Sequence, residues 1–134
     1  MDITFRVGSP IDQKAGALLV PVAGGEIDGA ASPLLRELDA RLSGHVSALA
    51  GDAGFSGKAG ATLTVPTLGH LPATRLILIG IGAEERLTAA SLTRSYGAAA
   101  LAARDAGART LAVALPAESA APRIAAIEAA ALGL

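Results

Sequence analysis

The sequence contains no cysteine and no tryptophan, and its aromatic side chains are limited to two phenylalanines and one tyrosine. Without cysteine, the chain has neither disulfide bonds nor thiolate ligands for a metal. No apolar run approaches the roughly 20 residues that a membrane-spanning helix needs. The first residues also lack the basic segment and apolar core of an export signal. We therefore expect a cytoplasmic protein with no membrane partner.

Charge is scarce as well, and it is balanced. Lys and Arg together number 11, Asp and Glu number 12, and the formal net charge is −1. This balance gives no electrostatic reason to expect nucleic acid or an anionic membrane as a partner. What the chain has instead is alanine, about a quarter of its residues, within a hydrophobic fraction of 51%. Its 134 residues suffice for a real core, and we predict a single domain over residues 1–134.

The most informative stretch is 76–82, with the sequence LILIGIG. A strand that faces water on one side alternates apolar and polar residues, whereas this run is apolar until its glycines. It therefore predicts a strand buried on both faces, inside a sheet that helices cover above and below. The end at Gly80 and Gly82 is expected to open toward a helix, where open α/β sheets place their ligand loops.

The rest of the pattern predicts an α/β fold, a three-layer α/β/α domain with a mixed sheet. Strands are expected at 3–7, 17–22, 62–65, 76–82 and 110–115. The first should lie near an edge of the sheet and the second near its centre. Helices are expected at 33–43, 89–106 and 120–132. Glycines interrupt the pattern between 45 and 60, where we expect only a helical turn at 46–50 followed by a loop.

Local signals mark where two of these helices begin. Ser32 offers a capping hydroxyl, and the proline that follows it suits the first helical position. Thr88 is the expected N-cap of the second helix. Glu37 and Arg41 are four residues apart, the spacing of an ion pair on one helix face.

Two glycine-rich segments are the candidate ligand loops. Glycine amides before a helix can cradle a pyrophosphate, and both segments follow apolar strands. The candidate ligand residues are Gly24, Gly25, Asp28, Gly29, Gly80 and Gly82. Glu84 and Glu85 directly follow the second segment and would repel an anion. The alternative is that these glycines serve only the geometry of turns.

The polar residues form no recognisable catalytic or metal-binding motif. A two-metal hydrolase needs several carboxylates that converge on one cleft, whereas the acidic residues are scattered singly or as the pair Glu84-Glu85. His45 and His70 are lone histidines without a His-x-x-x-His partner, and no serine has the setting of a nucleophile elbow. We predict no catalytic residue, no metal ligand and no cofactor in this chain.

The basic residues form no stripe that would follow a nucleic-acid backbone. Arg36 and Arg41 are interleaved with acidic residues, and Arg94 and Arg104 fall on different faces of their helix. Nucleic acid is therefore an unlikely partner.

Four blocks resemble the amino-terminal domain of the leucyl (cytosol) aminopeptidases. They are ALLVPV at 17–22 with the glycines and Asp28-Gly29-Ala30 that follow it, GFSGKAG at 54–60, LILIGIGAEE at 76–85, and the helix that contains Arg94, Ala98 and Ala99 together with VALP at 113–116. Their order and spacing match that family, and they cover essentially the whole chain. One departure is Gly16, at a position where this family and the macro domains tend to carry an aspartate.

The resemblance implies a macro-domain-like fold that precedes a separate catalytic domain. In that family the catalytic domain holds two divalent ions, zinc or manganese, with a lysine and several acidic side chains. This chain ends at about the point where the linker to that domain should begin, so a fragment or a truncated product is expected. The resemblance thus implies a non-catalytic, structural domain of a metalloaminopeptidase, with the catalytic domain and other copies in a homo-oligomer as partners. The alternatives are a macro-domain-like module that binds ADP-ribose or a nucleotide, and a DNA-binding accessory domain.

Overall fold

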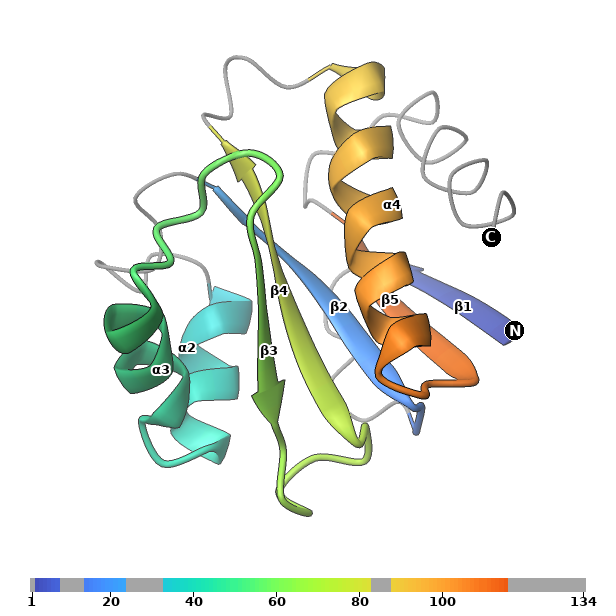
Figure 1. The fold of residues 1–134 in the computed structure, drawn as a ribbon. Coiled ribbons are helices and arrows are strands. Elements are labelled where there is room, and N and C mark those ends of the chain that lie inside the picture. Colours follow the sequence, from blue (N-terminus) through green and yellow to red (C-terminus); the bar gives the residue numbers. More distant parts are fainter. Residues whose placement is uncertain (1, 8–13, 24–32, 83–87, 116–134) are drawn as a thin grey trace.

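The structure, a computed structural model, describes residues 2–7, 14–23, 33–82 and 88–115. Their five strands form one sheet in the order β1-β5-β2-β4-β3 (Figure 1). The strands are β1 (Asp2–Val7), β2 (Ala17–Ala23), β3 (Thr62–Pro66), β4 (Arg75–Gly82) and β5 (Thr110–Leu115). The described helices are α2 (Pro33–Arg41), α3 (His45–Ala53) and α4 (Ala89–Asp105). Neighbouring strands are parallel except for β3, which runs antiparallel to β4, so the sheet is mixed as predicted.

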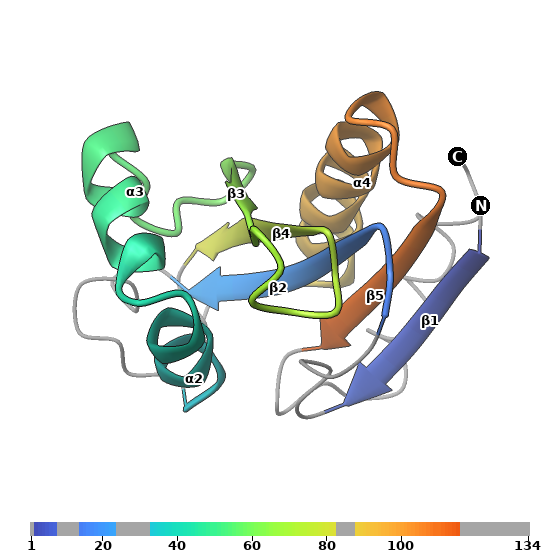
Figure 2. The same ribbon diagram turned by 90° about the horizontal axis from the view of Figure 1, so that it is seen from below.

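Helices cover both faces of this sheet and create two apolar layers (Figures 1 and 2). Alternate residues of β4 enter the two layers: Leu76 and Leu78 pack in the layer that contains α2 and α3, and Ile77 and Ile79 pack in the layer that contains α4. The prediction of a strand buried on both faces is confirmed, because all four side chains are fully buried. β4 lies one place from the edge, and the middle strand is β2.

The strands agree with the predicted ranges to within one residue at each end. β1 is an edge strand and β2 is central, as expected. The predicted helix at 120–132 and the predicted cap Ser32 lie outside the described residues.

The expectation of only a short turn at 46–50 is wrong, because α3 is a nine-residue helix. Its N-cap is Gly44, which has no side chain to accept a hydrogen bond from the first turn. Asp39 of α2 does this instead: its two carboxylate oxygens accept from the backbone N–H of Ser47 (3.1 Å) and from the Ser47 hydroxyl (2.7 Å). Val46 and Ala50 then bury one face of the helix. This capping comes from another element, so local periodicity did not reveal it.

Two further predicted helix signals, the Thr88 N-cap and the Glu37–Arg41 pair, are confirmed. The Thr88 hydroxyl accepts from the Ser91 N–H, and the Thr88 N–H donates to the Ser91 hydroxyl, both at 3.0 Å. This reciprocal pair is a capping box at the start of α4. Arg41 and Glu37 form the expected ion pair on α2 at 3.3 Å.

Candidate functional site

The carboxyl ends of β2 and β4 lie side by side, with Ala23 opposite Gly82 in the parallel register. The two predicted ligand loops therefore begin at neighbouring points, which is the usual position of a ligand site in an open α/β sheet. Of the six candidate residues, the structure describes Gly80 and Gly82. The others, Gly24, Gly25, Asp28 and Gly29, lie outside the described residues, as do the two glutamates after Gly82.

The amides of Gly80 and Gly82 are hydrogen-bonded within the protein, to the chain between α3 and β3. Gly80 N–H donates to the Ala61 carbonyl (2.7 Å), and Gly82 N–H donates to the Gly57 carbonyl (2.9 Å). In return, Gly60 N–H donates to the Gly80 carbonyl (3.1 Å). We call residues 57–61 the closing segment. The amides of the two described candidate glycines are thus already hydrogen-bonded within the protein.

Close approach of the closing segment explains both glycines. A Cβ on Gly80 would overlap the carbonyl oxygen of Lys58, so no larger residue fits without moving backbone. Gly82 has a φ of +75°, a region that favours glycine, and a Cβ there would lie 3.2 Å from the Cβ of Ala59. These glycines therefore have a structural reason that does not involve a ligand.

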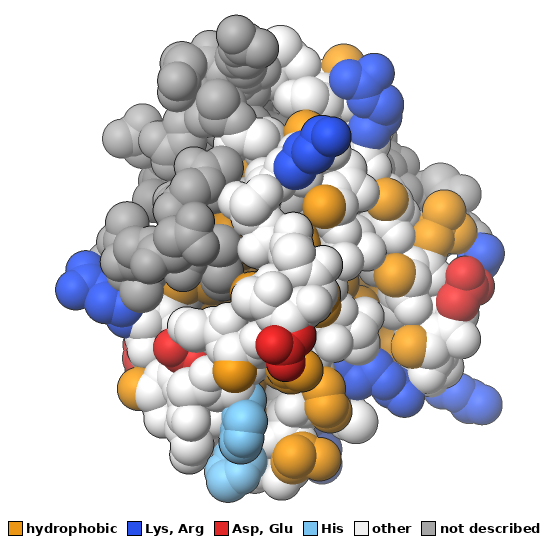
Figure 3. All heavy atoms as spheres, turned by 60° about the vertical axis from the view of Figure 1, so that its left-hand side comes forward, with side chains coloured by type: hydrophobic (Ala, Val, Ile, Leu, Met, Phe, Trp, Pro, Cys, Tyr) orange, Lys and Arg blue, Asp and Glu red, His pale blue; other side chains and the backbone are white. Residues whose placement is uncertain are grey.

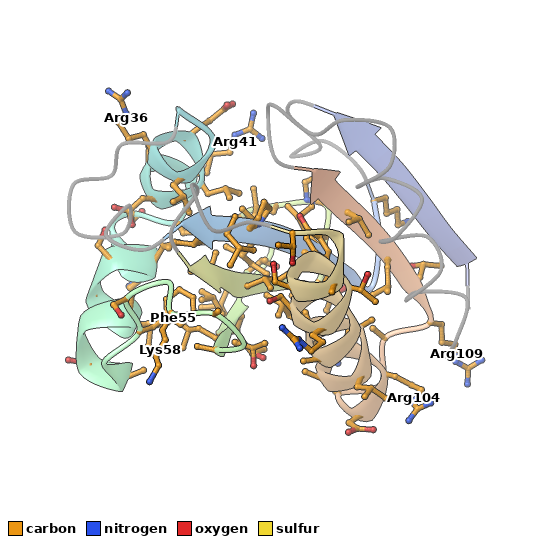
Figure 4. The ribbon with its side chains drawn as sticks, turned by 90° about the horizontal axis from the view of Figure 1, so that it is seen from above. Arg36, Arg41, Phe55, Lys58, Arg104 and Arg109 are labelled. Carbon is orange, nitrogen blue, oxygen red and sulfur yellow. The ribbon has the colours of Figure 1, made fainter. Side chains whose placement is uncertain are left out.

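The closing segment is itself positioned by α3. Phe55 is buried, and its N–H donates to the Ala50 carbonyl at 2.8 Å, just beyond the end of the helix. Gly57 and Gly60 take positive φ values of 89° and 85°, which bend the segment toward β4. Lys58 is exposed, and Figure 4 shows it and Phe55 beside α3. The sequence signal for this contact is the glycine-rich block at 54–60, which belongs to the family resemblance.

The glycine at position 16 also has a packing explanation. Gly16 N–H donates to the Thr110 hydroxyl (2.8 Å) and carbonyl (3.1 Å). A Cβ at this position would lie 3.1 Å from the Cβ of Ala108. The Gly16 carbonyl accepts from the guanidinium of Arg75 at 3.3 Å. A side chain at this position would need Ala108 to shift by a few tenths of an ångström, so glycine suits the tight local packing.

The titratable side chains gather into no site among the described residues. No group of three or more His, Asp or Glu in this part of the chain could hold a metal ion. His45 and His70 are both exposed. Tyr96, unlike these two histidines, is buried. It packs in the α4 layer, and burial raises the pKa of its hydroxyl above the usual value. No described helix is long and apolar enough to cross a membrane.

The basic side chains that the structure describes are distributed rather than clustered. Figure 4 places Arg36 and Arg41 on α2, and Arg104 and Arg109 at the opposite side of the molecule. On the face that bears α2, α3 and β3, the visible Lys and Arg side chains form no continuous patch (Figure 3). Binding of nucleic acid therefore gains no support from this face.

The fold defines the class: a macro-domain-like α/β/α domain. The macrodomain of Mycobacterium tuberculosis DarG superposes with a TM-score of 0.69 at 14% identity, over 98% of this chain and 88% of that one. A variant of tomato leucine aminopeptidase superposes with a TM-score of 0.80 at 23% identity, over 98% of this chain and 27% of that one.

The sequence then gives the family. The model of the cytosol aminopeptidase family, N-terminal domain, matches residues 19–134, so the chain belongs to this family. A probable cytosol aminopeptidase of Geobacter sp. (strain M21) is 37% identical over 123 residues, which cover 92% of this chain and 24% of the relative. The neutral, chloroplastic leucine aminopeptidase of Solanum lycopersicum is 44% identical over 85 residues, 63% of this chain and 14% of the relative. This chain thus spans a quarter or less of the curated relatives it matches.

Proposed function

We propose that this chain is a non-catalytic structural domain of a metal-dependent aminopeptidase, where it helps to assemble the parent oligomer and shapes access to the catalytic domains. The observation that carries the proposal is the closing segment. At the strand end where this fold offers a ligand site, Gly80 and Gly82 donate to the carbonyls of Ala61 and Gly57. Because these two amides are already hydrogen-bonded within the protein, they favour a structural role over binding of a small ligand.

The chemistry of the parent belongs to the rest of the enzyme in this proposal. The two divalent ions, zinc or manganese, would be bound in the catalytic domain, where the amino end of a peptide is also held. The described residues of this chain do not fit such a site, because they contain no group of three His, Asp or Glu side chains. The name of the Geobacter relative supports a cytoplasmic location for the parent.

A chimera tests the assembly role. In the Geobacter relative, the segment that matches this chain is either deleted or replaced by residues 1–134, and mass and peptide turnover are measured for both proteins. We expect the deletion to lose the native oligomer and the replacement to restore it together with turnover. A deletion protein that assembles and turns over like the intact relative would rule out the structural role.

The second candidate is a macro-domain-like module for ADP-ribose or a nucleotide. The likeness to the DarG macrodomain favours it at the level of the fold, and the candidates Gly24, Gly25, Asp28 and Gly29 supply further amides. The bonds from Gly80 and Gly82 to the closing segment weigh against it. Calorimetry with ADP-ribose distinguishes the two functions.

A further inference from the structure

The free edge of β3 carries backbone groups that no other strand of the described sheet uses. β3 is the last strand in the sheet and pairs only with β4. Ala61 accepts from Gly80, and Thr67 N–H donates to Thr74, on the side of β4. Because hydrogen bonding alternates along an antiparallel strand, Leu63 and Val65 also bond toward β4. The N–H groups of Thr62 and Thr64 therefore point to the open side.

This edge lacks the charged side chains that discourage pairing with another strand. Natural sheets guard exposed edges with charged side chains, with proline and by keeping the edge strand short. Of these, β3 has its length of five residues and Pro66 at its end, but no charge. Residues 59–74, which include β3 and the turn after it, contain no Asp, Glu, Lys or Arg. Thr62, Thr64 and Pro66 are exposed. An extended strand can therefore approach the edge without meeting a charge.

The turn that follows β3 adds an apolar contact beside this edge. Leu68 is 76% exposed and has a φ of +52°, a conformation that L residues rarely adopt. The turn is held in place by the buried Thr67 hydroxyl, which donates to the carbonyls of Ala73 (2.6 Å) and Thr74 (2.9 Å). A single exposed leucine does not by itself mark an interface, so the proposal below rests on the backbone groups of β3.

We propose that the β3 edge pairs with the β3 edge of a second copy of this chain, antiparallel and about a two-fold axis at Leu63. Self-pairing suits an uncharged edge, because a two-fold interface sets each residue against the same surface of its copy. In this register Thr62 lies opposite Thr64 of the other copy, and all four outward N–H groups find carbonyl acceptors. Pro66, which has no N–H, lies beyond the paired residues. The inference rests on the proposed role in assembly and names the surface that performs it.

The test measures the mass of the 134-residue chain by analytical ultracentrifugation from about 10 μM to about 1 mM, the range in which weak pairs form. The unaltered chain is expected to dimerise. Thr64→Pro removes an outward N–H but no bond to β4, so the dissociation constant should rise at least about tenfold. The double variant Thr62→Lys with Thr64→Lys keeps every backbone donor and sets lysines opposite lysines. It should also weaken the dimer, and added salt should restore part of the loss. Circular dichroism confirms that each variant is folded.

A matched control adds the same charge elsewhere. Ala90→Lys with Ala98→Lys places two lysines on exposed positions of α4 and should leave the dimer unchanged. A chain that stays monomeric at every concentration would overturn the edge pairing. So would a dimer that both β3 variants leave intact, because that dimer would use another surface. If the edge fails in this way while the chimera still assembles, the structural role stands and only its surface is wrong.

Discussion

At the scale of single residues, Gly80 shows how closely two backbone segments can approach each other. Its missing side chain lets the closing segment bond to β4, and a Cβ would meet the Lys58 carbonyl. We expect Gly80→Ala to lower the free energy of unfolding by about 1–3 kcal/mol, the usual cost of overpacking. Gly51→Ala is the control: it lies in α3 with open space around it and should stabilise by about 0.5–1 kcal/mol. Urea melts of both variants measure the free energy of unfolding. A Gly80→Ala chain as stable as the unaltered chain would contradict the close approach of the closing segment to β4.

Leu78 gives the second residue-scale prediction, because it is fully buried between β4 and the α2–α3 layer. Leu78→Ala should destabilise the domain by about 2–5 kcal/mol, the range for a leucine removed from a packed core. Leu101 on α4 is 42% exposed, and Leu101→Ala should cost about 1 kcal/mol or less. Equal losses in paired urea melts would mean that the burial of β4 is wrong.

At the scale of elements, α3 depends on a cap that another helix supplies. Asp39→Ala removes both acceptors of Ser47 and should cost about 1 kcal/mol, the usual value of an N-cap. Asp52→Ala in the last turn of α3 also removes a carboxylate, and should be neutral or slightly stabilising because a negative charge is unfavourable at a helix C-terminus. Thermal melts compare the two variants. Equal stability of the Asp39→Ala and Asp52→Ala chains would mean that Asp39 does not stabilise α3 as a cap.

The strands were predictable and α3 was not, for a physical reason that these elements illustrate. Apolar runs such as 76–82 report burial directly, so the sequence alone indicates a strand with both faces covered. The length of α3 depends on Asp39, eight residues before Ser47. The closing segment likewise depends on bonds between 57–61 and β4, two stretches that no local period connects. The sequence therefore indicates the candidate glycines, but only the structure shows the hydrogen-bond partners of Gly80 and Gly82.

At the scale of the whole molecule, we expect that the chain does not bind ADP-ribose or a nucleotide. ADP-ribose titrated into the 134-residue chain should give no measurable heat, and any affinity should be about millimolar or weaker. The reason is the loss of the Gly80 and Gly82 amides to the closing segment. Micromolar binding by the unaltered chain would favour the macro-domain function instead.

The most direct test of the central claim is whether the purified chain hydrolyses leucine p-nitroanilide. The described residues contain no group of carboxylates and histidines for a pair of metal ions, and a two-metal hydrolysis needs such a group. The assay is run with and without added manganese or zinc, beside a mock purification that controls for host peptidases. We expect no turnover above that control under any of these conditions. Metal-dependent turnover that purifies with the chain would contradict it.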